Sequence, residues 1–146
     1  MNISTRGRYG LRALVEIAQN SDSQLATIRD ISKKQKIPTT YLEQILYRLR
    51  KAGLVRSFRG AKGGYMLAKK SNRITIREVV RALDGPIGIA YCDSPKLRDK
   101  SCIGQGVCPS GVLWKKLEET IDDFLSKVTL ADLKKKSFRP KRGTTK

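Results

Sequence analysis

The chain has 146 residues, with 31 Lys and Arg against 13 Asp and Glu, no His, and a formal net charge of +18. That length suits a single domain with a modest core, and the charge favours a polyanionic partner, with nucleic acid ahead of an anionic membrane surface. No stretch has the apolar length of a signal peptide or a transmembrane helix, so we expect a cytoplasmic protein with no membrane partner.

Positive charge is concentrated in the first half of the chain. Residues 1–70 contain 15 Lys and Arg and four acidic residues, whereas residues 71–133 contain nine of each. A basic half beside a neutral one indicates a single electrostatic footprint for nucleic acid. Residues 134–146 contain seven basic and no acidic residues, and this composition predicts a disordered basic tail.

Three short amphipathic helices are predicted first in the chain. The apolar stripe of the first is Leu11, Leu14, Val15 and Ala18. The second starts at Thr27, with Asp30 at the spacing of a capping box. The third starts at Thr40, with Glu43 as its capping partner, and ends in a left-handed residue at Gly53. The apolar stripe of the third is Leu42, Ile45, Leu46 and Leu49.

A hairpin and a fourth helix come next. Residues 54–58 and 65–67 predict two short strands around the glycine-rich loop 59–64. The fourth helix begins with Thr75 and Glu78, again at the spacing of a capping box. Its apolar positions are Ile76, Val79, Val80 and Leu83.

A long helix is predicted after a loop that ends near residue 110. Its apolar residues alternate at spacings of three and four, which is a heptad seam: Trp114, Leu117, Ile121, Phe124 and Val128. The seam favours pairing with a second copy of the chain, and the alternative is that the stripe packs within its own chain. Thr129 and Asp132 predict the cap of a short final turn.

The order helix, helix, turn, helix and basic hairpin is that of a winged helix-turn-helix. We therefore expect a mainly α fold with a small β wing, together with a long dimerisation helix. The expected division is a DNA-binding region at 1–85, a cysteine loop at 86–110, the dimerisation helix and short final turn at 111–133, and the tail at 134–146.

The outer face of the third helix and the tip of the hairpin form the predicted DNA-binding surface. Gln44 can pair with adenine, and Arg48 with guanine or phosphate, in a major groove. The tip residues suit the minor groove or the backbone. RNA is less favoured, because no sheet studded with aromatic residues is predicted. The predicted contact residues are Thr39, Thr40, Tyr41, Gln44, Arg48, Lys51, Arg59 and Lys62.

Three cysteines, Cys92, Cys102 and Cys108, lie in the predicted loop with nine and five residues between them. The odd number argues against a disulfide framework, and the chain has no fourth Cys and no His to complete a structural zinc site. Three thiolates with an open or oxygen-filled fourth position favour an iron–sulfur cluster. Zinc and a thiol switch without metal stay open as alternatives.

Four segments together resemble the Rrf2 family of bacterial regulators. They are TRGRY at 5–9, YLEQ at 41–44, LRKAGLV at 49–55 and RGAKGGY at 59–65, and the likeness extends from about residue 2 to residue 133. The family includes regulators that sense iron–sulfur status, nitric oxide or iron, and repressors of cysteine metabolism. The resemblance is strongest to the cluster-bearing, IscR-type branch, because clusterless relatives lack the cysteine trio.

The resemblance implies a homodimer in which the long last helices cross. It also implies that the three cysteines ligate an iron–sulfur cluster beside the DNA-binding half, with 2Fe-2S favoured over 4Fe-4S. Tyr41, Glu43, Gln44 and Arg59 would fall where family members contact bases or tune base contacts.

Two departures from the family pattern leave the fourth ligand of such a cluster open. Gly111 stands where some relatives have a His, and Arg8 stands where others use an acidic residue from the partner chain. Asp93 and Asp99 are local oxygen candidates for the fourth position.

These features predict a homodimeric, sequence-specific transcription regulator that binds operator DNA under control of an iron–sulfur cluster. Its signal would be iron–sulfur status, iron, oxygen or redox state, or nitric oxide. The alternative is a clusterless winged-helix repressor of cysteine or sulfur metabolism that responds to thiol oxidation or to a protein partner. An enzyme is not expected, because the chain has no His, no phosphate loop of Walker spacing and no pairing of nucleophile and base.

Overall fold

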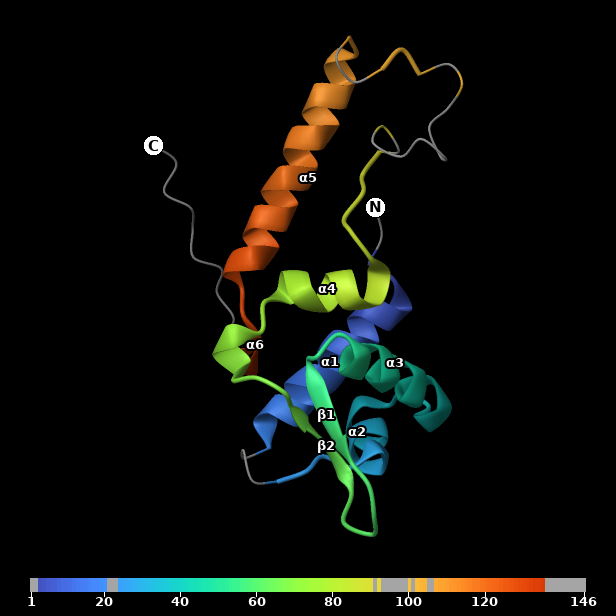
Figure 1. The fold of residues 1–146 in the computed structure, drawn as a ribbon, viewed down its shortest axis with the longest axis vertical. Helices are drawn as coiled ribbons and strands as arrows, with labels where there is room; N and C mark the ends of the chain where they lie inside the picture. Colours follow the sequence, from blue (N-terminus) through green and yellow to red (C-terminus); the bar gives the residue numbers. More distant parts are fainter. Residues whose placement is uncertain are drawn as a thin grey trace.

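The computed structural model describes residues 3–20, 24–90, 92, 100, 102–104 and 107–135. The elements, in chain order, are α1 (Thr5–Gln19), α2 (Ile28–Gln35), α3 (Thr39–Lys51), β1 (Val55–Phe58), β2 (Gly64–Leu67), a 3₁₀ turn (Ser71–Arg73), α4 (Ile76–Asp84), α5 (Pro109–Lys127) and α6 (Leu130–Lys134). The expected mainly α fold with a small β wing is confirmed (Figure 1). None of the described helices is long and apolar enough to cross a membrane.

The first three helices begin and end largely as their sequence predicts. The Thr27 side chain accepts a hydrogen bond from the backbone N–H of Asp30 and caps α2. Gly53 has φ +71° and follows the end of α3, as expected for a left-handed cap. The predicted cap of α3 at Thr40 is wrong, because Pro38 precedes the first turn and leaves Thr40 inside the helix.

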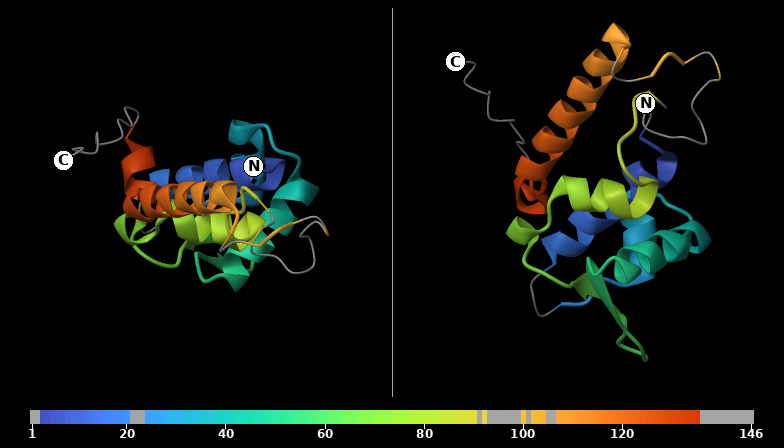
Figure 2. Two further views of the ribbon diagram at one scale, coloured as in Figure 1. Left: turned by 90° about the horizontal axis from the view of Figure 1, so that it is seen from above. Right: turned by 45° about the horizontal axis from the view of Figure 1, so that its top comes forward.

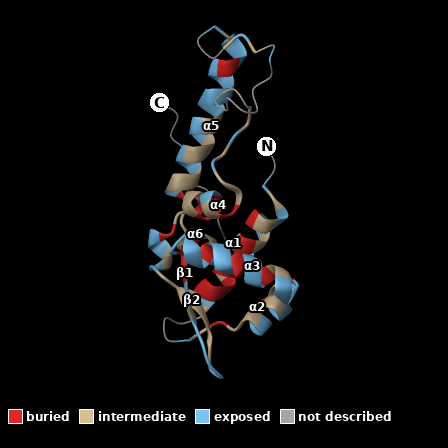
Figure 3. Ribbon diagram, turned by 45° about the vertical axis from the view of Figure 1, so that its right-hand side comes forward, coloured by how far each residue is buried: buried red, intermediate tan, exposed pale blue. Residues whose placement is uncertain are grey.

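The core lies where α1, α3 and α4 meet. Leu14 and Ile45 are completely buried, and Leu83 is 2% exposed. A Cβ atom on Gly10 would lie 2.2 Å from Leu83 Cδ1 and 3.2 Å from Ile45 Cγ2, so only glycine lets α1 approach α4 this closely. Figure 3 shows that buried residues concentrate in this region, whereas α5 is mostly half-buried or exposed.

The wing is an antiparallel hairpin whose register pairs Val55 with Leu67 and Phe58 with Gly64. The segment before α2 joins its free edge through a bridge between Ala26 and Tyr65. Hydrogen bonds of 2.9 Å in both directions between these two residues fix the wing to the helical core. The loop between the strands is therefore carried on a rigid support.

The chain returns to the first half of the molecule at its described end. The N–H of Ile76 donates to Val128 O over 2.9 Å, and the N–H of Leu130 donates to Ile74 O over 2.8 Å. Leu130 is completely buried in the main core, and Val128 is 9% exposed against Ile76 and Val80. The final turn, α6, thus packs with residues 1–85, and Val128 is buried in its own chain although the sequence places it in the seam.

The predicted caps of α4 and α6 both form as full capping boxes, from Thr75 with Glu78 and from Thr129 with Asp132. Helix α4 lies across the top of α1 and α3, and α5 extends away from this body (Figures 1 and 2). The fold therefore has a compact body formed by α1 to α4 and the wing, and a projecting helix, with the cysteine segment between α4 and α5.

Candidate nucleic-acid interface and cysteine segment

The outer face of α3 presents most of the predicted DNA-binding residues to solvent. Thr39, Thr40, Gln44, Arg48 and Lys51 are exposed. Gln44, Arg48 and Lys51 share one face opposite the completely buried stripe, whereas Thr39 and Thr40 are exposed at the start of the helix. The face is therefore held rigidly while its polar side chains stay free.

Tyr41 differs from its predicted neighbours because it is half-buried. Its ring packs edge-on against Tyr9 of α1, with a centroid distance of 6.0 Å and an interplanar angle of 72°. Arg12 lies over the other ring, 5.3 Å from the centroid of Tyr9. Tyr41 thus supports the junction of α3 with α1.

Tyr47 is a candidate contact residue that sequence reasoning missed. Its side chain is 53% exposed, and it lines a hollow of about 880 Å³ with Gln44 and Lys51. Arg50 and Lys51 each place a cationic group 5.6 Å from its ring centroid. Its position three residues after Gln44 was the available signal, because residues three apart share a helix face.

The tip of the wing carries Arg59 and Lys62, and both are exposed. The tip lies at the opposite end of the molecule from the far end of α5 (Figure 1). Within the described residues, Arg48, Lys51, Arg59 and Lys62 form no ion pair, whereas Lys34, Lys69, Arg77 and Arg81 each contact a carboxylate. The cations of the candidate interface are therefore available to phosphate.

The three cysteines are free and half-buried. In the part of the chain that the structure describes, no three His, Cys, Asp or Glu side chains come close enough to hold a metal ion. The structure therefore does not bring the cysteines together, and the candidate ligands Asp93 and Asp99 lie outside the described residues.

Cys108 has a distinct environment at the start of α5. It is the N-cap residue of the helix, and its Sγ lies 3.0 Å from the hydroxyl of Ser110. The hydrogen bond from Ser110 and those from the backbone N–H groups of Gly111 and Ser110 lower the pKa of the thiol, although desolvation opposes them. A thiolate is the form that binds soft metals such as iron in clusters, so the donor chemistry fits a cluster.

The face of α5 that carries the seam is only partly covered. Leu117 and Phe124 are 40% and 46% exposed, and Trp114 is 37% exposed. Leu113, which the sequence analysis did not assign, is 58% exposed and lies four residues before Leu117 on the same stripe. Ile121 is half-buried. These residues leave an apolar stripe open along the projecting helix.

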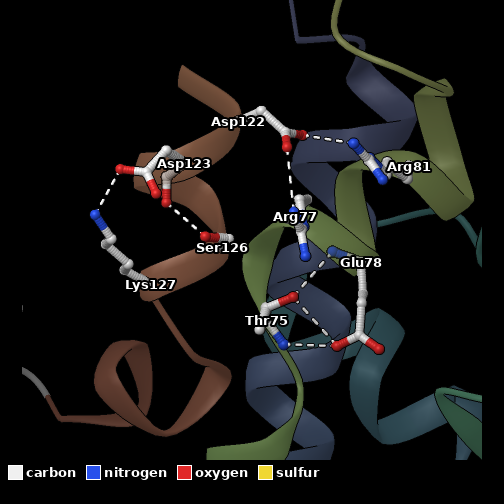
Figure 4. Close-up of polar contacts among 8 residues, drawn as sticks. All are labelled: Thr75, Arg77, Glu78, Arg81, Asp122, Asp123, Ser126 and Lys127. Atoms are coloured by element: carbon white, nitrogen blue, oxygen red, sulfur yellow. Dashed lines mark hydrogen bonds and ion pairs between the residues drawn. The ribbon is translucent and has the colours of Figure 1, made fainter. Parts of the chain in front are cut away.

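The neighbouring face of α5 is polar and is tied to the rest of the chain. Asp122 pairs with Arg77 over 3.2 Å and with Arg81 over 2.9 Å, both on α4 (Figure 4). One turn earlier, Glu118 accepts hydrogen bonds from the backbone of the segment that leads to Cys92. The direction of α5 is therefore fixed by charged contacts as well as by packing.

We predict that Cys108 is the thiol of the metal-free protein that alkylates fastest near neutral pH. Its lowered pKa leaves more thiolate at pH 7, and a Ser110→Ala substitution should move the midpoint of its pH–rate profile to higher pH. Peptide-resolved mass spectrometry after timed alkylation measures all three rates in one sample. Equal midpoints for wild type and Ser110→Ala would contradict the assigned role of the hydroxyl.

Known proteins match this chain over most of its length. The family described as "Rrf2: Iron-dependent Transcriptional regulator" matches residues 3–136. The HTH-type transcriptional regulator IscR of Erwinia tasmaniensis is 39% identical over 133 residues, which cover 91% of this chain and 78% of that protein.

Solved structures agree with the sequence matches. The structure of CymR, the global cysteine regulator of B. subtilis, has a TM-score of 0.78 and 31% identity, and the match covers 94% of this chain and 98% of that one. The structure of T. potens IscR has a TM-score of 0.73 and 32% identity, with 93% and 88% of the two chains covered. The chain belongs to the Rrf2 family, and its similarity is to the IscR-type branch.

Proposed function

We propose that this Rrf2-family transcription regulator is a homodimer that binds specific operators and is controlled by an iron–sulfur cluster on Cys92, Cys102 and Cys108. The observation that carries the proposal is that one chain joins exposed cations on α3 and the wing, with no ion pair among the described residues, to three free thiols. The relatives named IscR, and the family description as iron-dependent, support it.

The DNA-binding half would insert α3 into a major groove, which is about 12 Å wide and admits one helix. Gln44 presents an amide that matches the edge of adenine, and Arg48 matches guanine or phosphate. Thr39 and Thr40 sit at the start of α3, where N–H groups and hydroxyls can bind phosphate. The wing would place Arg59 in the adjacent minor groove.

Substitutions in this surface should separate base contacts from backbone contacts. Gln44→Ala and Arg59→Ala should each cost about 1–3 kcal/mol on an operator selected from random duplexes, and should relax base preference. Lys51→Ala should lower the affinity for all duplexes equally. It should also reduce the slope of log affinity against log salt concentration by about one, the value of one phosphate contact. Fluorescence anisotropy over a salt series measures these effects.

The controls for this experiment are random duplexes of equal length. If Arg59→Ala weakens operator and random duplex by the same factor, the wing contacts only the backbone. An affinity that does not change with salt would contradict nucleic-acid binding altogether.

Two copies of the chain would pair through the apolar stripe of α5. One helix in one groove gives a weak complex, whereas a two-fold dimer binds two half-sites about one helical turn apart. Leu113, Leu117 and Phe124 supply exposed apolar area along about three turns of α5, whereas Val128 packs within its own chain. Dimerisation would cover this area and set the separation of the two α3 helices.

Phe124→Asp should shift the protein towards monomer, because a charge in the paired stripe would be buried without a partner. Analytical ultracentrifugation over a concentration series measures the shift. Lys115→Asp is the matched control, since it lies nine residues before Phe124, about two and a half turns, and so on the opposite side of α5. A Phe124→Asp protein that sediments as wild type would show that the stripe does not pair copies.

The thiol groups of Cys92, Cys102 and Cys108 would hold the cluster. When bound, the cluster supplies an iron centre that reacts with oxygen or nitric oxide, or is lost when iron is scarce. Gly111 in the first turn of α5 has no side chain to offer as a fourth ligand, so the fourth position would be filled by another group or stay open. Holding three thiolates on one core would fix Cys92, Cys102 and Cys108 relative to one another, between α4 and α5.

Replacing all three cysteines with Ala should yield a folded protein without cluster absorption and with altered operator affinity. A 100-fold change would correspond to about 2.7 kcal/mol of coupling between cluster and DNA. The measurement is anaerobic operator binding of cluster-loaded wild type and of the triple variant at one salt concentration, with iron and sulfide counts. Equal affinities of the two proteins on every operator would show that the cysteines do not regulate DNA binding.

A clusterless repressor is the second candidate. The fold match to CymR and the separation of the cysteines in the described structure favour it. It predicts colourless anaerobic protein with no iron or sulfide, and operator binding that changes when the thiols are oxidised.

A further inference from the structure

Glu118 contacts the segment that leads into Cys92. One oxygen of its carboxylate, Oε1, accepts hydrogen bonds from the backbone N–H of Ile89 over 2.6 Å and of Ala90 over 3.2 Å. Ala90 is two residues before Cys92 in the chain. The carboxylate of α5 thus fixes the backbone just before the first thiol.

These contacts are stronger than ordinary loop contacts because the acceptor is charged. A carboxylate accepts shorter and stronger hydrogen bonds from N–H groups than a neutral oxygen does. Ile89, Ala90 and Glu118 are half-buried, which limits competition from water. A single side chain therefore holds two consecutive backbone donors in place.

The same face of α5 is tied to α4 one turn later. Asp122 lies four residues after Glu118 and binds both Arg77 and Arg81 (Figure 4). Helix α4 in turn packs Leu83 into the space beside Gly10, next to Ile45 of α3. A series of direct contacts therefore links the backbone before Cys92 to the DNA-binding helix.

We propose that Glu118 is a positioning residue that holds the Cys92 end of the cysteine segment on α5. Through this contact, occupancy of the thiols is coupled to the position of α5 on the rest of the chain. The inference rests on the proposed function for the identity of the bound group. The contact itself exists in the metal-free chain. Ligation of Cys92 fixes residues 89–92, and Glu118 transmits that restraint to α5 and, through Asp122, to α4.

The first test uses full-length, metal-free protein. Glu118→Ala should speed amide hydrogen exchange at Ile89 and Ala90 by about tenfold, because both lose a charge-assisted acceptor. Alkylation of Cys92 should also become faster, while that of Cys108 stays unchanged. Glu118→Gln keeps a neutral acceptor and should give a smaller increase.

Glu119→Ala is the matched control, because Glu119 is the next residue on α5, is exposed, and contacts only Lys116 at 3.8 Å among the described ion pairs. It should leave all these rates as in wild type. Circular dichroism melting of each variant establishes that it is folded. Unchanged exchange at Ile89 and Ala90 in folded Glu118→Ala would overturn the positioning role.

The second test uses protein reconstituted with iron and sulfide. Glu118→Ala should lose cluster absorption to a chelator about tenfold faster than wild type, and its ratio of cluster-loaded to cluster-free operator affinity should fall towards one. If Glu118→Ala exchanges its amides faster but keeps the wild-type rate of cluster loss and the wild-type affinity ratio, the proposed coupling is wrong.

These experiments test the cluster-controlled regulator and the positioning role of Glu118 independently. If wild type takes up no iron and sulfide, the proposed cluster regulator is wrong and the coupling to thiol occupancy falls with it. The exchange and alkylation rates of the metal-free protein still decide whether Glu118 holds the segment. If wild type loads a cluster and Glu118→Ala behaves like Glu119→Ala, only the role of Glu118 is wrong.

Discussion

The close approach of α1 to α4 at Gly10 is the constraint on which the other features depend. A methyl group there would lie 2.2 Å from Leu83 Cδ1, inside the contact distance of any two carbon atoms. Because Ile45 of α3 reaches the same point, three helices share one contact. Helix α4 is thereby held against the DNA-binding helix on one side, while its other side receives α5. A movement of α4 therefore displaces α3 as well, since a close-packed interior transmits displacement.

The end of α4 is fixed by the start of α1. The backbone N–H of Ser4 donates to Asp84 Oδ2 over 3.0 Å, its hydroxyl donates to Asp84 Oδ1, and Arg6 lies 3.7 Å from Oδ1. An acid at the C-terminus of a helix is normally unfavourable, but the same carboxylate lies at the N-terminus of α1, where negative charge is stabilised. The cysteine segment leaves the body directly after this junction. It therefore starts from a fixed point and is held again by Glu118 a few residues later.

Several acidic residues of this basic chain fix elements to one another. Glu16 is 5% exposed and accepts from Lys34 over 2.7 Å and from Gln35 over 3.0 Å, and these contacts hold α2 on α1. The hydrogen bond to Glu16 raises the pKa of Lys34, which keeps that lysine charged. The cations on α3 and on the wing have no such partners among the described residues, so their charge is directed outward. Cations paired with carboxylates thus lie in the scaffold, whereas the cations of the proposed DNA-binding surface have no ion pair among the described residues.

Features that depend on residues a few positions apart could be predicted from the sequence. The buried stripe of α3, the boxes at Thr75 and Thr129, and the glycine-rich hairpin follow from helix periodicity, capping and turn geometry. Which side chains of an outward face stay exposed depends on contacts between elements that are distant in the sequence. Tyr41 turns to Tyr9 while Tyr47 remains open, and Val128 joins Ile76 in the core although the heptad spacing counts it in the seam. The contacts of Glu118 and Asp122 likewise join residues 28 to 45 positions apart. No local pattern encodes such pairs, because they depend on how α4 and α5 cross after the chain has folded.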